Sequence, residues 1–245
     1  MPLTIHPCSP ADFPRVFEIF SLAFGQAHVF VNCMYPSHYT PSGRAVGATR
    51  MAEIAASDPN TKFIKLVDDE TGEMVAWAKW NIYVDTIPEE KDITGDYWEN
   101  DEDKQFVQHL TTEFMRKRRA AVEGERGNLV SLDILCVDPA HQRRGAGRQL
   151  VKWGTKIADD LGFTVSILIP NLYFLLCLWN DGMNGRTNTA EQAVVESSDK
   201  GRGLYASEGF EFVEKCETPV PEKWKARGAE SFNWMVRPKK AKVEA

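Results

Sequence analysis

The chain has 245 residues, of which 43% are apolar and 26% charged, and its net charge is −6. This is ordinary globular composition, with length for one large domain or two small ones. A mildly acidic chain is a poor candidate for general binding of nucleic acid or of anionic membranes, because both need a basic surface. The longest apolar run, Val165–Trp179, is shorter than the roughly 20 residues that a membrane helix needs.

Cysteine and histidine are scattered along the chain. The five cysteines are odd in number with no pair at CxxC spacing, and the five histidines form no HxxxH or HxH group. We therefore expect no disulfide framework, a reducing and hence cytoplasmic compartment, and no metal site. The N-terminal residues lack a charged segment followed by an apolar one, so the sequence predicts no signal peptide.

The first predicted helix follows Ser9–Asp12, which has the serine, proline and acid of a capping box. Its apolar residues recur at helical spacing, and such a stripe could line a ligand pocket but is more often core. These residues are Phe13, Val16, Phe17, Phe20 and Phe24. A weaker helix is expected over Arg44–Ala56.

The middle of the chain predicts a hairpin and an acidic loop. Lys62–Val67 and Met74–Val84 have the composition of strands, and the acidic segment ending at Gly72 between them is typical of a turn. Asp85–Gln105 contains nine Asp or Glu and two Lys; it could attract a cationic substrate or be a solvated loop. A helix capped near Asn100 follows, with Phe106, Leu110 and Phe114 on one face.

The most informative segment is Asn128–Phe163. Val130–Val137 is strand-like, a basic glycine-rich loop follows it, and apolar residues from Leu150 to Leu161 then repeat as in an amphipathic helix. A strand, a glycine-rich loop and a helix in this order form a phosphate-binding arrangement, because the first amides of a helix have no intrahelical partner. Arg143, Arg144 and Arg148 add charge-assisted donors.

Two motifs in this region resemble the GNAT superfamily of N-acetyltransferases. Val137-Asp138-Pro139 followed by Gln142–Gly147 resembles the family's Val-x-Pro and Q/R-x-x-G-x-G/A signature, and Gly201–Phe210 resembles its LYxxxGF signature. The resemblance implies one GNAT domain over residues 1–245. Its fold would be α+β, an α/β/α sandwich with a mixed, mostly antiparallel sheet and splayed fourth and fifth strands. It suggests a fungal-type, small-molecule acetyltransferase.

The resemblance also implies a co-substrate, acetyl-CoA, and a reaction. The chain would move an acetyl group to a primary amine by direct attack in a ternary complex, as a monomer or homodimer, without metal, nucleic acid or membrane. The alternative is a non-catalytic acyl-CoA-binding module. The implied cofactor-binding residues are Leu135, Cys136, Val137, Gln142, Arg143, Arg144, Gly145, Ala146, Gly147 and Arg148.

Transfer to an amine needs a proton acceptor, because only about one alkylamine in a thousand is neutral at pH 7. Asp133 matches a position where some family members carry a catalytic carboxylate, and strand alternation puts it on the face of Leu135 and Val137. Glu196 is the second candidate, and either acid could be structural. Tyr205 matches the family tyrosine that protonates the coenzyme A sulfur. Cys136 has no adjacent histidine and is interpreted as a buried hydrophobe.

The segment between the two motifs is too long for the family. The predicted helix ends near Gly162, and the natural fifth strand, Ala193–Ser198, comes some 30 residues later. Residues 165–192, Val165–Gln192, are 28 codons, or 84 nucleotides, the size of a fungal intron. Their ends, Val-Ser and Gln, can be encoded by intron-border sequences. We interpret them as a translated, unspliced intron whose removal leaves 217 residues; the rival is a true insertion that forms a lid or an interface.

The sequence gives less information on the amine acceptor than on the co-substrate. In the resembling family it is bound by segments that here are His28–Tyr39 and Asp85–Asp103. The first is rich in aromatic residues and the second in acids. Together they indicate a small amine acceptor, such as an aromatic amine or a polyamine.

Overall fold

The computed structural model describes residues 2–89, 91–167, 192–197, 201–229 and 231–238. The described strands form a single eight-stranded sheet in the order β1-β2-β3-β4-β5-β6-β8-β7. Only the β4–β5 and β5–β6 pairs are parallel, so the predicted mixed and mostly antiparallel sheet is confirmed. The strands are β1 Leu3–Pro7, β2 Thr61–Asp68, β3 Met74–Tyr83, β4 Leu129–Val137, β5 Thr164–Ile167, β6 Gln192–Ser197, β7 Glu211–Glu217 and β8 Ser231–Pro238.

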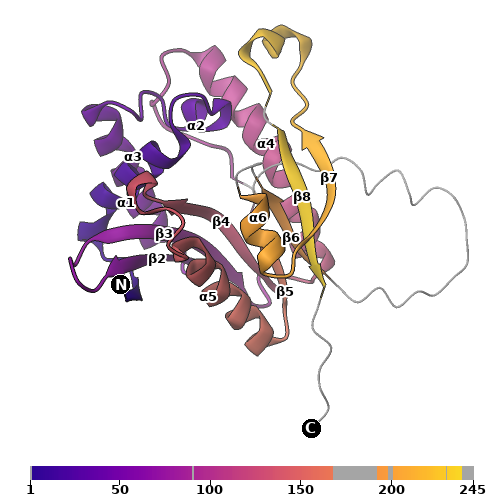
Figure 1. Cartoon of the computed structure of the whole chain (residues 1–245). Helices are drawn as coiled ribbons and strands as arrows, with labels where there is room; N and C mark the ends of the chain where they lie inside the picture. The colour runs from indigo at the N-terminus through magenta and orange to yellow at the C-terminus, as the bar shows by residue number, and fades with distance from the viewer. Residues whose placement is uncertain (1, 90, 168–191, 198–200, 230, 239–245) are drawn as a thin grey trace, which may run out of the picture.

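Helices cover both faces of the sheet (Figure 1). Helices α5 and α6 lie on one face, and α1 to α4 lie on the other. No described helix is both long and apolar enough to span a bilayer. The α-helices are α1 Phe13–Phe24, α2 Val29–Met34, α3 Pro41–Ser57, α4 Asp101–Gly124, α5 Ala146–Leu161 and α6 Arg202–Ser207.

Helix α1 begins at the predicted capping box. The Ser9 amide donates to Asp12 Oδ2 at 2.7 Å, and a 3-10 turn, Pro10–Asp12, leads into the helix. The aromatic stripe packs into the core against α3, β2 and β3, so its interpretation as core is confirmed. Four of its five members are buried, namely Phe13, Val16, Phe17 and Phe20.

The other predicted elements of the first 163 residues also form. The weak helix is α3, the hairpin is β2 and β3, and the helix after the acidic loop is α4. Phe106 and Leu110 are buried as expected, while the side chain of Phe114 lies outside what the structure describes. Helix α2 was not expected.

A bulge interrupts β4 beside β3. Trp80 pairs with Leu132 and Lys79 pairs with Ile134, so Asp133 is an extra residue that has no paired residue on β3. The alternation of side chains therefore changes phase at this point. Before and after the bulge, Leu132 and Leu135 both face α5.

The end of α5 leads to a strand that the sequence did not predict. Ala193–Ser198 was expected to pair beside β4; it contributes to β6, but β5 lies between β6 and β4. Strands β4 and β5 pair only from Leu129 to Leu132. Residues 168–191 of the predicted insertion lie outside the described residues.

Candidate active site

The centre of the site is the edge of β4 beyond Leu132. Strand β3 pairs with β4 along its whole length, up to Val137. On the opposite edge, none of the described strands pairs with Asp133–Val137. This stretch, which includes Leu135 and Cys136, therefore offers backbone donors and acceptors to an extended ligand.

The loop after β4 leads directly to the N-terminus of α5. Gly145 is the N-cap residue, with φ +82°, a conformation that favours glycine. No side chain caps the first turn of α5 in the described structure, so the amides of Ala146, Gly147 and Arg148 are directed towards the loop. These amides and the positive end of the helix dipole can bind an anion such as a pyrophosphate.

Gly147 lets α5 pack closely against β4 and α6. A Cβ on this residue would lie 3.0 Å from Leu204 Cδ2, 3.5 Å from Leu135 Cδ2 and 3.7 Å from Val137 Cγ2. A methyl group here would require the Leu204 side chain to shift slightly, and the other two contacts would be ordinary ones. Close packing thus favours a glycine at the second glycine position of the motif.

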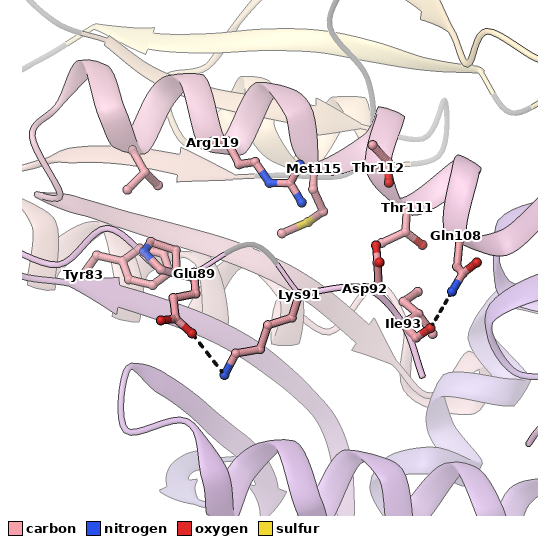
Figure 2. Close-up of a pocket in the computed structure, with 12 residues that line it drawn as sticks. Tyr83, Glu89, Lys91, Asp92, Ile93, Gln108, Thr111, Thr112, Met115 and Arg119 are labelled. Atoms are coloured by element: carbon pink, nitrogen blue, oxygen red, sulfur yellow. Dashed lines mark hydrogen bonds and ion pairs between the residues drawn. The ribbon is translucent and has the colours of Figure 1, made fainter. Parts of the chain in front are cut away.

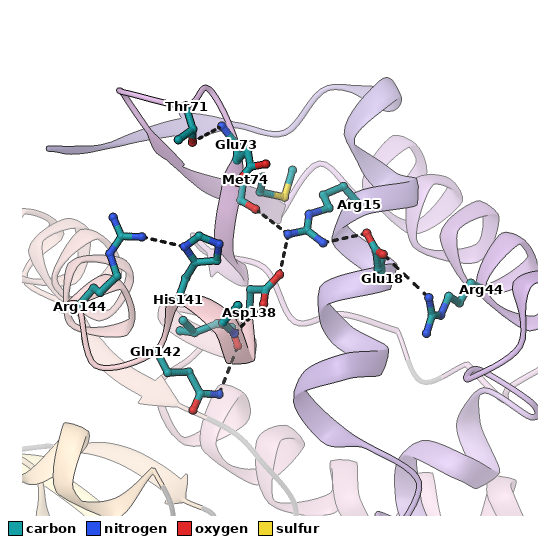
Figure 3. A network of polar contacts seen from close by, with 12 residues as sticks. Arg15, Glu18, Arg44, Thr71, Glu73, Met74, Asp138, His141, Gln142 and Arg144 are labelled. Atoms are coloured by element: carbon teal, nitrogen blue, oxygen red, sulfur yellow. Dashed lines mark hydrogen bonds and ion pairs between the residues drawn. The ribbon is translucent and has the colours of Figure 1, made fainter. Parts of the chain in front are cut away.

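Two ion pairs anchor the loop on the side away from the open edge of β4. Figure 3 shows that of Arg15 with Asp138, together with the contact of Arg144 with His141. Arg144 donates to Asp68 Oδ2 at 2.7 Å and lies 2.7 Å from His141 Nδ1. Asp68 is fully buried, and the hydrogen bond from Arg144 is the main reason that the pKa of its carboxyl lies below the ordinary value of 3.8. Arg15 of α1 binds Asp138 at 2.6 Å, at the start of the loop.

The three arginines of the motif therefore lie in different surroundings. Arg144 is bound to Asp68 on the far side of the loop. Arg148 pairs with Glu208 of the turn after α6, at 2.9 Å, and remains half exposed. Arg143 is exposed, with φ +62°. Gln142 is exposed too, and its amide lies 3.5 Å from the Val137 carbonyl.

The bulge places Asp133 on the opposite face from that predicted. Its Oδ2 accepts a hydrogen bond from Lys79 Nζ at 2.6 Å, and both side chains are mostly buried. Lys79 lies two residues after Trp77, which packs among α1 and α3. Alternation had predicted the face of Leu135 and Val137, which packs against α5, and this prediction was wrong because the bulge adds a residue.

Tyr205 of α6 approaches the site from the α5 face. It is 4% exposed and packs edge-to-face on Phe210. Burial raises the pKa of its hydroxyl well above the ordinary 10, with a smaller contribution from nearby Cys136. Tyr205 therefore keeps its proton across the neutral pH range.

The sequence family of the chain agrees with this geometry. Residues 29–172 match the Acetyltransferase (GNAT) family. The chain belongs to the GNAT family of acetyltransferases. GNAT acetyltransferases use acetyl-CoA for N-acetylation, which accounts for a loop suited to a pyrophosphate.

Solved GNAT structures share the fold at low sequence identity. The polyamine N-acetyltransferase of Drosophila melanogaster, which forms N-acetylagmatine, is 12% identical over 97% of this chain and 100% of its own, with a TM-score of 0.56. The histone acetyltransferase HPA2 and related acetyltransferase of Corynebacterium glutamicum is 15% identical over 100% of both chains, with a TM-score of 0.54. Mosquito arylalkylamine N-acetyltransferase-like 5b is 10% identical over 97% and 100%, with a TM-score of 0.56.

At these identities the likeness shows the fold alone. No curated protein sequence matches the chain significantly. The expectation of a fungal-type member finds no support among these neighbours.

The structure tests the prediction for Cys136 but not the one for Glu196. Cys136 is 1% exposed, and burial raises the pKa of its thiol well above 9.0, which confirms its interpretation as a buried hydrophobe. The backbone of Glu196 lies in β6 opposite Trp234, and its side chain lies outside what the structure describes.

The acidic stretch of this GNAT chain packs against α4 and encloses a cavity of about 200 Å³ (Figure 2). Glu89 and Lys91 of the stretch face this space, as does Arg119 of α4, so charges of both signs line it. Tyr83 lines it from the end of β3, four residues beyond Lys79, or about 13 Å along a strand. The stretch therefore places part of its charge away from Asp133.

Sequence reasoning missed two charged residues of this GNAT site. Lys79 is the one charged residue of β3, a mostly apolar strand, and an isolated charge of this kind indicates a buried carboxylate partner. Asp68 begins the acidic segment that predicts a turn before Gly72, and no local pattern links it to Arg144, which is 76 positions away.

Proposed function

We propose that this chain is an acetyl-CoA-dependent N-acetyltransferase that acts on a small primary amine by direct attack in a ternary complex. The observation that carries the proposal is the open edge of β4, with a carboxylate at one end and the N-terminus of α5 at the other. Tyr205 of α6 belongs to the buried cluster against which Leu135 and Val137 of β4 pack. Binding groups and candidate proton carriers thus adjoin one extended strand.

Acetyl-CoA would lie along this edge. The amides of the first turn of α5, with the exposed Arg143 beside them, would bind the pyrophosphate. The backbone of Leu135–Val137 would pair with the pantetheine arm and donate to the thioester oxygen, where charge develops. Arg144 would hold the loop in shape from behind.

The proposed chemistry moves one acetyl group and one proton. The amine nitrogen attacks the thioester carbonyl carbon, and the carbon–sulfur bond breaks as the tetrahedral intermediate collapses. Asp133 takes the proton that the attacking nitrogen loses, directly or through water, and releases it to solvent before the next cycle. Tyr205 donates its proton to the departing sulfur and later recovers one from solvent. Glu196 is the alternative proton acceptor.

The test combines acetyl-CoA binding by calorimetry with coenzyme A release in the presence of primary amines. Asp133→Asn should lower kcat by about 100-fold, the usual contribution of a general base, with little change in the Kd for acetyl-CoA. Tyr205→Phe should lower kcat about tenfold or more and leave the fold intact, because only a hydroxyl is lost.

The matched control is Asp160→Asn, which alters an exposed carboxylate on α5. It should retain full activity. Acetyl-CoA binding without turnover of any amine would instead identify a non-catalytic acyl-CoA-binding module. The proposal includes a cytoplasmic location, which the scattered cysteines support, and a monomer or homodimer.

A further inference from the structure

The face of the sheet that carries Asp133 is covered by α1 and α3, and α3 carries an arginine in unusual surroundings. The guanidinium carbon of Arg50 lies between the rings of Tyr35 and Tyr97, 4.4 and 4.2 Å from their centroids. The Trp98 ring is 5.8 Å away. Arg50 is half-buried, and loss of water around it lowers its pKa from the ordinary value. Aromatic rings therefore replace much of its hydration.

The rings around Arg50 are themselves fixed. Tyr35 packs edge-to-face against Phe17 and Phe20 of α1, with centroids 5.1 and 5.3 Å apart. The Trp98 indole N–H donates to the Cys33 carbonyl at 2.8 Å, which ties the loop of Tyr97 to α2. The guanidinium is thus held in one position before any ligand binds.

The described residues use only part of the hydrogen-bonding edge of Arg50. Its Nη1 donates to the Met34 carbonyl at 2.6 Å, and a guanidinium has five N–H donors. In the described part of the chain, no carboxylate lies within ion-pair distance of Arg50; Glu53 acts on it only at longer range. The aromatic rings contact the guanidinium group itself and do not use its N–H donors. These donors lie along the edge of the group, which is the part that binds a carboxylate in a bidentate manner.

Tyr35 connects Arg50 with Asp133. Burial is the main reason that the pKa of the Tyr35 hydroxyl is raised, while Arg50 lowers it and Asp133 raises it. Tyr35 shares a buried cluster with Ile134, the neighbour of Asp133 on β4, and its ring contacts Arg50, so both charges lie near this one side chain. Asp133 is already paired with Lys79, and Glu53 lies beyond ion-pair distance of Arg50, so Arg50 is a cation without an ion-pair partner among the described residues. An ammonium group at its edge would be repelled, and an anion would be attracted.

We infer that Arg50 binds a carboxylate on the acceptor, so that the acceptor is an amine that also carries a carboxylate, as an amino acid does. The inference rests on the proposed function, because it takes the reacting amine to lie at Asp133. It narrows the small-amine prediction and disfavours polyamines. The acceptor must reach from Asp133 past Tyr35 to Arg50. The number of carbon atoms between its amine and its carboxylate therefore determines whether both groups can bind.

The test is a matched panel of acceptors with the full chain and acetyl-CoA. The ω-amino acids from glycine to 6-aminohexanoate are compared with the alkylamines and the diamines of the same chain lengths. We expect one amino acid length to exceed its alkylamine in kcat/KM by about tenfold or more, the effect of one charge-assisted pair. Arg50→Met should reduce that ratio to about one, and Arg50→Lys should restore only part of it.

The control is Arg44→Met, which changes another arginine of α3, one that lies 4.0 Å from Glu18 instead. It should keep the full preference. A wild-type preference for diamines or plain alkylamines would overturn the inference and leave the proposed function standing, even if the Arg50 variants fail to fold. A carboxylate preference that survives in Arg50→Met would also overturn it. Failure of every acceptor, with acetyl-CoA bound, would refute the proposed function itself.

Discussion

At the scale of single residues, two ion pairs show which parts of the site the sequence can predict. They are Lys79 with Asp133 at the β4 bulge and Arg144 with Asp68 beside the loop. The motifs located the glycine-rich loop and Tyr205, and the match to a family position singled out Asp133, because residue types and order carry that information locally; the roles of these residues stay predictions. The partners Lys79 and Asp68 depend on pairing between distant strands, which the motif does not encode. The prediction of the sheet face on which Asp133 lies was wrong, because one extra residue in β4 changes which face the following side chains occupy.

Asp68→Asn tests the support of the loop. Because the folded pKa of Asp68 lies below its unfolded value of about 3.9, its charge contributes stability above that pH, and the contribution is lost as pH falls through the folded pKa. The variant should therefore be less stable than wild type at pH 5 to 7, and the difference should shrink below about pH 3.8. Urea unfolding midpoints across this range measure it.

The same variant should weaken acetyl-CoA binding several-fold by calorimetry at pH 7, since Arg144 loses its charged anchor. Asp69→Asn, at the exposed neighbouring position, is the control. An unchanged Kd together with an unchanged pH profile of stability would contradict a role for Asp68 in shaping the loop.

At the scale of elements, helix periodicity was the most reliable signal. The repeat that predicted α5 included Gly154, and the structure shows why glycine is needed there. A Cβ on Gly154 would lie 2.3 Å from Trp80 Cζ2 on β3. Helix α5 therefore packs directly on the indole, close to the strand pair that carries the site.

Gly154→Ala should destabilise the protein by about 1–3 kcal/mol, because the buried Trp80 ring must move to admit a methyl group. Gly124→Ala, at the end of α4, meets nothing within 4 Å and should be neutral or slightly stabilising. Urea unfolding midpoints of the two variants measure the difference. Equal stability of the two would show that α5 can shift without cost.

At the scale of the whole molecule, the origin of residues 165–192 decides which strand lies beside β4. We propose that these residues are a translated intron. Their removal would join Thr164 to Ala193, so that most of β5 is replaced by β6 in the position next to β4. Strands β5 and β6 pair at only two positions, Ser166 with Val194 and Ile167 with Val195, so little pairing would be lost.

The 217-residue chain should therefore fold, bind acetyl-CoA at least as tightly as the full chain, and be more soluble, since an apolar run is removed. Calorimetry on the two chains side by side measures the binding. The genomic codons give an independent check. A TCN codon for Ser166 or a CAA codon for Gln192 would rule out the intron, and a true insertion would remain.

The anchoring of the loop also has a consequence for biosynthesis. Both of its charged anchors, Arg15 and Asp68, precede it in the chain. During translation, at about 5–20 residues per second, the hairpin and α1 leave the ribosome seconds before the loop does. Arg15 and Asp68 are therefore already present when the loop leaves the ribosome. The loop can form its ion pairs with them while the C-terminal part of the protein is still being synthesised.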